Sequence, residues 1–196
     1  GVLELPSLIT MNMPEEAKVS DNQYLIRWYA MTADGAEVDK LYSYHNYVGG
    51  WYMQLQSGLA QRMTVVQQGN GYEFSIWDEN FESTTKLFTV YVLTGQKREE
   101  QALIDNRFVL YRTESTVYSA NMVVASPAYG ISKDGLINSF HLVIGKIDAQ
   151  QTLSVQVHPG DEYAGANEGG KLGKTEAWII LNCQEGAKLA YGVNTD

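Results

Sequence analysis

The first 140 residues contain short runs in which apolar and polar side chains alternate, the period expected of strands that bury one face. In residues 24–29, for example, Tyr24, Ile26 and Trp28 fall on one face. Further runs share this aromatic and β-branched character, at residues 41–48, 51–55, 62–67, 72–77, 87–93, 108–111 and 117–122. The pattern predicts a mainly β structure.

Glycine-rich turns separate several of these runs. Gly49 and Gly50 lie between the runs at 41–48 and 51–55. The Gly-Asn-Gly triplet at residues 69–71 separates the next pair in the same way. Two β-rich runs joined by so short a glycine turn are typical of a hairpin, so the sequence predicts two hairpins here.

Two segments favour helix instead. Residues 96–106 are polar around a short apolar stretch, and residues 132–140 begin with Ser132, a residue type preferred at helix N-termini. Residues 1–20 are expected to form an edge strand followed by a loop. Together these features predict a β-sandwich-like domain with one or two short helices over residues 1–142.

The composition changes near His141, where a segment rich in Gly, Gln and acidic residues begins. No linker rich in Pro, Gly and Ser marks this junction. We therefore expect a β-rich domain of unknown function at residues 1–142, followed directly by a second domain at residues 143–196.

Composition and charge narrow the function classes. Hydrophobic residues make up 44% of the chain, enough to bury a sizeable core. The net charge of −9 argues against a nucleic-acid binder, which needs a basic face, and against docking on anionic lipid. No run of 18 apolar residues is present, so no membrane span is expected. The single cysteine, Cys183, excludes an intramolecular disulfide and fits a reducing compartment.

His45 is the first candidate for chemistry, because it lies among tyrosines in a predicted strand. It could act as a general base beside Tyr42, Tyr44 or Tyr47. It could also be a half-buried histidine that hydrogen-bonds a neighbour. We favour the second interpretation, since no second ligand-type residue lies at a fixed offset.

The aromatic side chains at residues 42–52 also allow two interpretations. Aromatic rings pack well against the apolar faces of pyranose sugars, so this cluster could form a sugar-stacking face. Cross-strand aromatic packing would need the same residue types. We favour packing here too.

Residues 153–158 alternate in the manner of a strand that lines a cavity. Leu153, Val155 and Val157 share one face, and the opposite face carries Ser154, Gln156 and His158. After a turn-rich stretch at residues 161–173, a second strand is predicted, with Glu176 near its start. An imidazole, an amide oxygen and a carboxylate make a partial ligand set for a divalent metal. Taken alone, such residues are more often the polar lining of a cavity.

The sequence motifs of this region favour the metal-binding interpretation. Leu-Ser-Val-Gln-Val-His-Pro at 153–159, Asp-Glu-Tyr-Ala at 161–164 and Gly-Lys-Thr-Glu-Ala-Trp at 173–178 closely resemble class I mannose-6-phosphate isomerases. Those enzymes are zinc-dependent proteins of the cupin type, and the resemblance extends over residues 144–192. It implies a partial cupin-like jelly-roll segment after the first domain.

The resemblance also implies roles for individual residues. Gln156, His158 and Glu176 would be zinc ligands, while Ser154 and Lys174 would line the substrate pocket and take part in catalysis. The implied reaction interconverts mannose 6-phosphate and fructose 6-phosphate. A sugar-phosphate substrate and a cytoplasmic location follow from the same resemblance, although an extracellular or envelope location stays open for residues 1–142.

The sequence departs from the family pattern at several points. The family takes a fourth ligand, a histidine, and a phosphate-binding arginine from a later region, and neither appears before Asp196. His141 is a poor substitute, because tetrahedral closure needs a specific direction as well as a residue type. Gly160 stands where the family usually has Asp. We therefore expect a partial or fused protein, inactive as an isomerase in this form, whose open sheet edges allow self-association.

Two functions thus compete at this stage. One is a mannose-6-phosphate isomerase-like protein with a zinc site. The alternative is a non-catalytic, envelope-associated β-domain at residues 1–142 that binds a glycan or a protein.

Overall fold

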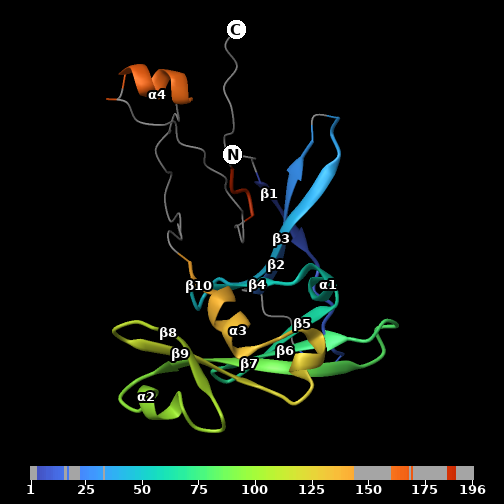
Figure 1. The fold of residues 1–196 in the computed structure, drawn as a ribbon, viewed down its shortest axis with the longest axis vertical. Helices are drawn as coiled ribbons and strands as arrows, with labels where there is room; N and C mark the ends of the chain where they lie inside the picture. The colour runs from blue at the N-terminus through green and yellow to red at the C-terminus, as the bar shows by residue number, and fades with distance from the viewer. Residues whose placement is uncertain are drawn as a thin grey trace. The chain divides into compact units, whose positions relative to one another are not determined.

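The computed structural model describes residues 4–15, 17, 23–32, 34–143, 160–167, 169 and 185–188. The chain divides into two compact units, Gly1–Lys146 and Ile147–Asp196, which are described separately below. The first unit contains two antiparallel sheets (Figure 1). The prediction of a mainly β structure is therefore confirmed.

The first sheet has the strand order β1–β2–β3–β4–β10. Its strands are β1 (Glu4–Ile9), β2 (Gln23–Met31), β3 (Glu37–Asn46), β4 (Trp51–Leu55) and β10 (Phe140–Leu142). The first four strands follow one another along the chain, and β10 returns after the whole second sheet to pair with β4. β1 is an edge strand, as predicted for the N-terminal region.

The second sheet has the order β5–β6–β7–β9–β8. Its strands are β5 (Met63–Gln68), β6 (Gly71–Trp77), β7 (Thr84–Thr94), β8 (Phe108–Arg112) and β9 (Thr116–Met122). The predicted hairpin at residues 69–71 is confirmed, with Gly69 at φ +59° in the turn.

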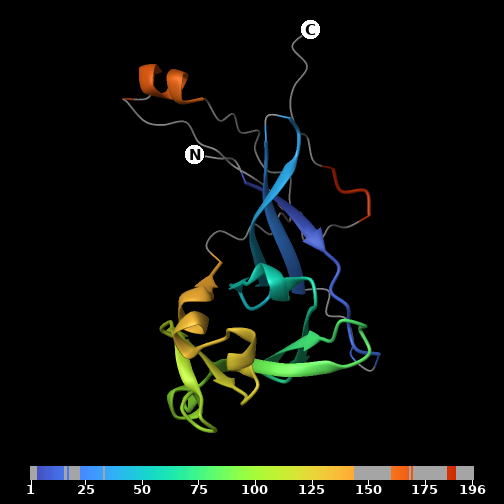
Figure 2. The same cartoon turned by 45° about the vertical axis from the view of Figure 1, so that its right-hand side comes forward.

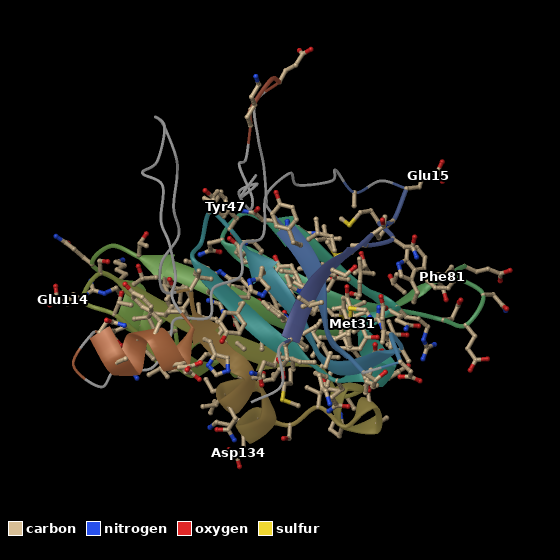
Figure 3. All side chains as sticks on the ribbon, turned by 90° about the horizontal axis from the view of Figure 1, so that it is seen from above. Glu15, Met31, Tyr47, Phe81, Glu114 and Asp134 are labelled. Carbon is tan, nitrogen blue, oxygen red and sulfur yellow. The ribbon has the colours of Figure 1, made fainter. Side chains whose placement is uncertain are left out.

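The helices are short. They are α1 (Ser57–Ala60), α2 (Arg98–Gln101), the 3₁₀ helix η1 (Ser126–Tyr129), α3 (Lys133–Ser139) and α4 (Asp161–Asn167). The predicted cap of α3 is present, because the Ser132 hydroxyl accepts a hydrogen bond from the Gly135 amide at 3.1 Å. Asp134 in the first turn points outward from α3 (Figure 3). No helix among the described residues is long and apolar enough to cross a membrane.

One expectation for the second unit is wrong. The sequence predicts a turn-rich stretch at residues 161–173, whereas residues 161–167 form α4. The negative charges of Asp161 and Glu162 in its first turn interact favourably with the partial positive charge of the helix N-terminus, which stabilises a helix here. The cupin-like strands predicted for this unit lie outside the described residues.

A single aromatic core lies between the two sheets of the first unit. Trp51 of β4 is fully buried and contacts aromatic rings from both sheets. Its ring centroid lies 5.3 Å from Tyr44 and 5.5 Å from Phe140 in its own sheet, and 5.3 Å from Tyr72 of β6. The two sheets therefore pack face to face through side chains, which confirms the predicted sandwich.

The turn before β4 is fixed by this core. The Gly49 amide donates a hydrogen bond to the Asn46 Oδ1 atom at 2.5 Å. A Cβ atom at Gly49 would lie 2.6 Å from both that oxygen and Trp51 Nε1, which is closer than any side chain tolerates. Glycine is therefore required where the chain enters the core strand.

The far end of the β2–β3 hairpin extends beyond β4 (Figure 2), since β4 pairs only with residues 42–46 of β3. Arg27 holds this end together through Glu37 at 2.6 Å and Asp39 at 2.5 Å. The Tyr42 hydroxyl and Arg27 both lower the pKa of the Asp39 carboxyl. Exposed pairs of this kind contribute little to the stability of a fold.

Replacing Phe74 should test the sandwich core. Phe74 is fully buried, stacks on Phe88 and contacts the edge of Tyr44. We expect Phe74→Ala to lower the free energy of unfolding by about 3–5 kcal/mol, measured by urea denaturation of the whole chain. The fully exposed Val124 supplies the control, since Val124→Ala should change stability by less than about 0.5 kcal/mol. Equal midpoints for both variants would rule out this core.

Candidate functional site

The residues predicted for metal binding and catalysis lie outside the described residues: Ser154, Gln156, His158, Lys174 and Glu176. The structure therefore leaves their predicted roles untested. Within the described ranges, no group of three or more His, Cys, Asp or Glu side chains is arranged to hold a metal ion.

His45 behaves as predicted. It lies in β3, stacks on Tyr52 at 4.9 Å between ring centroids, and its Nε2 atom is 3.0 Å from the Ser43 hydroxyl. The same hydroxyl accepts a hydrogen bond from the Trp28 indole at 2.8 Å. Burial lowers the pKa of His45 to about 4. A half-buried, neutral histidine that hydrogen-bonds a neighbour is the interpretation that we favoured.

His141 belongs to the first unit, in β10. Its ring stacks on Tyr52, the same tyrosine that stacks on His45, with ring centroids 4.9 Å apart. His45, Tyr52 and His141 thus form one row across β3, β4 and β10. The His141 Nε2 atom is buried and has no hydrogen-bond partner in the part of the chain that the structure describes. The tyrosine ring between the two imidazoles prevents them from sharing one metal ion.

The aromatic cluster at residues 42–52 serves mainly as packing. Tyr44 and Trp51 are fully buried, and Tyr42 is nearly so. The Tyr44 ring contacts the rings of Trp51 and Phe74, as the packing interpretation requires. These three side chains are not available to stack on a sugar.

Among the described residues of the first unit, hollows of about 100 Å³ lie at two places considered below. One lies between β4, α1 and α3 and is lined largely by apolar side chains that continue the core, among them Leu59 and Leu136. The other lies on the outer face of the second sheet and is mainly polar. Its lining residues are Gln68, Gly71, Glu73, Lys86, Thr89 and Tyr91.

Residues of three neighbouring strands build this second hollow and its border. Glu73 of β6 is paired with Thr89 of β7, and Thr89 is paired with Asn121 of β9. Paired residues point to the same face of a sheet, so the three side chains form a polar row. Glu73 makes an ion pair with Lys86 at 2.7 Å, which places one acceptor and one donor side by side.

The turn after α2 fixes the aromatic wall of the hollow. Asp105 and Asn106 both adopt positive φ, at 54° and 58°, which is unusual for residues with side chains. Arg107 follows directly, and its guanidinium lies 3.7 Å from the centroid of the Tyr91 ring. The Tyr91 hydroxyl accepts a hydrogen bond from Asn121 at 3.4 Å. The ring is thereby held in one orientation.

Sequence reasoning missed this polar hollow. Its residues come from separate strands, and each one alone looks like an ordinary solvent-facing strand position. The sequence signal that could have indicated the hollow is the polar side chains on the outward faces of two predicted strands, at Glu73 and Thr89. Pairing register was needed to bring them together.

Comparison with known proteins gives partial similarity to one enzyme group. Mannose-6-phosphate isomerase ManA of Bacillus subtilis is 56% identical over 55 residues, which is 28% of this chain and 18% of that protein. The probable mannose-6-phosphate isomerase GmuF of the same organism is 51% identical over 53 residues, 27% and 17% of the two chains. Mannose-6-phosphate isomerase of Streptococcus mutans is 45% identical over 64 residues, 33% and 19%.

The similarity thus covers a limited segment. The chain spans less than a fifth of the length of these curated relatives. No family profile matches the chain, and no solved structure matches it. A segment of the chain is similar to mannose-6-phosphate isomerases.

The depressed pKa of His45 predicts a pH dependence of stability. The unfolded chain takes up a proton near pH 6.5, whereas the folded chain resists protonation of His45 down to about pH 4. Stability from His45 is therefore fully present above pH 6.5 and is lost as the pH falls through this window. We expect His45→Gln to reduce the loss between pH 6.5 and pH 4 by about 1–3 kcal/mol, measured by urea denaturation. Identical pH profiles would show that His45 is not buried as described.

Proposed function

We propose that residues 143–196 form a mannose-6-phosphate isomerase-like domain, and that residues 1–142 form a separate β-domain. The observation that carries this proposal is 45–56% identity to mannose-6-phosphate isomerases over a short segment. The three motifs within residues 153–178 are where the sequence itself resembles that family, so we assign the similarity to this region. A cytoplasmic location is part of the proposal, on the same resemblance.

The donor set proposed for the metal is Gln156, His158 and Glu176. An amide oxygen, an imidazole nitrogen and a carboxylate oxygen suit a divalent ion of borderline character, and zinc fits them best. Neither a thiolate-rich nor an all-oxygen set is present in these motifs. A bound zinc ion would supply an electrophile for a sugar carbonyl oxygen without any change of redox state.

Lys174 and Ser154 are proposed to act on a sugar-phosphate substrate. Interconversion of an aldose and a ketose moves a proton between adjacent carbons and between the two oxygens that those carbons carry. The Lys174 ammonium can donate hydrogen bonds to an oxygen that gains negative charge, and its neutral form can take up a proton. The Ser154 hydroxyl can both donate to and accept from a sugar hydroxyl.

Three protein donors hold zinc less firmly than four. Even loss of the contacts that support a ligand typically costs about 10–100-fold in metal affinity. We therefore propose that this chain binds zinc through these three residues. Metal content is consequently a better test than isomerase activity.

Zinc analysis of the purified whole chain tests the donor set. After equilibration with zinc and removal of excess metal, we expect about one zinc ion per chain. His158→Ala should lower the affinity at least about tenfold, because it removes the nitrogen donor.

His141→Gln is the matched control, since it alters a histidine outside the proposed donor set. Its zinc content should equal that of the parent chain. Less than about a tenth of an equivalent of zinc in the parent, or equal loss in both variants, would refute the metal site. A chelator should lower the melting temperature of the parent more than that of His158→Ala.

A further inference from the structure

We propose that Met11 and Met13 are sites of sulfoxide formation, and that their oxidation opens the edge of the second sheet at β5. Both lie in residues 10–15, the segment that follows β1 and ends at Glu15 (Figure 3). We call this segment the methionine clasp. It belongs to the first unit, so the proposal is independent of the metal site proposed for residues 143–196.

The clasp covers a strand edge that needs a partner. β5 is the outermost strand of the second sheet and pairs with β6 on one side. Backbone N–H groups that point to the other side of an edge strand have no strand to bind. Thr64 and Val65 of β5 are nevertheless fully buried. Buried N–H groups are almost always paired, so an acceptor has to come from outside the sheet.

Met11 supplies this acceptor. Its sulfur accepts a hydrogen bond from the Val65 amide, with 3.2 Å between the nitrogen and Sδ. The Met11 side chain is half-buried and packs against the core of the first unit. A thioether is a weak acceptor, so the edge is closed by a weak hydrogen bond together with apolar packing.

Met13 makes a second sulfur contact on the opposite face of β5. Thr64 and Val65 are neighbours in a strand, so their side chains point to opposite faces. Val65 faces the core, and the Thr64 hydroxyl on the other face donates to the Met13 sulfur at 3.6 Å. Between the two methionines, the Asn12 carbonyl accepts a hydrogen bond from the Trp77 indole at 2.8 Å. The clasp therefore holds the edge through contacts on both faces.

Oxidation is incompatible with the Met11 contact. Hydrogen peroxide transfers one oxygen atom to a thioether: the sulfur gives up two electrons and forms an S–O bond, the peroxide O–O bond breaks, and water leaves. The 3.2 Å between the Val65 nitrogen and Sδ has no room for an oxygen atom at hydrogen-bonding distance from that nitrogen. An oxygen that points away from the amide would instead place a polar group in the apolar core. The clasp has to move in both cases.

The six methionines of the chain provide internal comparisons. Met53 and Met63 are 0% and 2% exposed, so peroxide should not reach them in the folded chain. Met31 is 56% exposed at the end of β2, in the other sheet, and its oxidation should leave β5 unchanged. Met11 and Met13 are half-buried and should react after Met31.

Peroxide treatment of the whole chain, followed by peptide mass spectrometry, tests this order of reaction. Once Met11 and Met13 carry sulfoxides, amide hydrogen exchange in residues 63–68 should become at least about tenfold faster. The melting temperature should fall by about 4–8 °C, and methionine sulfoxide reductases of both stereochemical classes should restore it. Unchanged exchange in β5 after full oxidation of Met11 and Met13 would overturn the proposal, as would oxidation of Met53 or Met63 before them.

The double variant Met11→Leu/Met13→Leu separates the clasp from other oxidisable groups. Leucine keeps the apolar packing and forms no sulfoxide, so peroxide should leave exchange in β5 unchanged. Met13→Leu alone keeps the Val65 hydrogen bond and should show a smaller response than the parent. Met31→Leu is the matched control and should respond to peroxide as the parent does. An equal response of the parent and the double variant would refute the role of the clasp.

Discussion

The packing of Trp51 against rings from both sheets is the interaction on which the first unit depends. Phe140 reaches Trp51 from the end of the unit, and Tyr72 reaches it from the second sheet. The requirement for glycine at position 49 follows from the same packing. The Trp51 side chain contacts β3, the returning strand β10 and the opposite sheet. Displacing it would therefore disturb the packing of the whole sandwich.

The elements of the first unit could largely be predicted because their signals are local. The glycine turns at residues 49–50 and 69–71 mark hairpins, and Ser132 marks the start of α3. β10 could not be predicted in this way, since a strand of three residues has too little periodicity to stand out. It exists because Phe140 and Leu142 complete the core beside β4, which is a tertiary effect.

The two candidate sites differ in whether the sequence alone is enough to recognise them. The proposed metal ligands stand within two short motifs, so the sequence alone brings Gln156 and His158 to notice. The polar hollow depends on the pairing of β6 with β7 and on the turn that carries Arg107. Nothing in the sequence around Thr89 indicates that its hydroxyl is buried with no hydrogen-bond partner among the described residues. Burial is decided by strands and turns far away in the sequence, and these are known only from the fold.

The return of β10 to β4 has a consequence for the order in which the unit assembles. Among the described strands, each of the other pairs except β7 with β9 joins strands that follow one another in sequence, and β7 and β9 are separated by β8 alone. Such local pairing favours early formation. The β4 edge, in contrast, stays unpaired until residue 142 has left the ribosome. During synthesis the second sheet can therefore fold before the first is closed, and until then the uncovered β4 edge is open to wrong pairing.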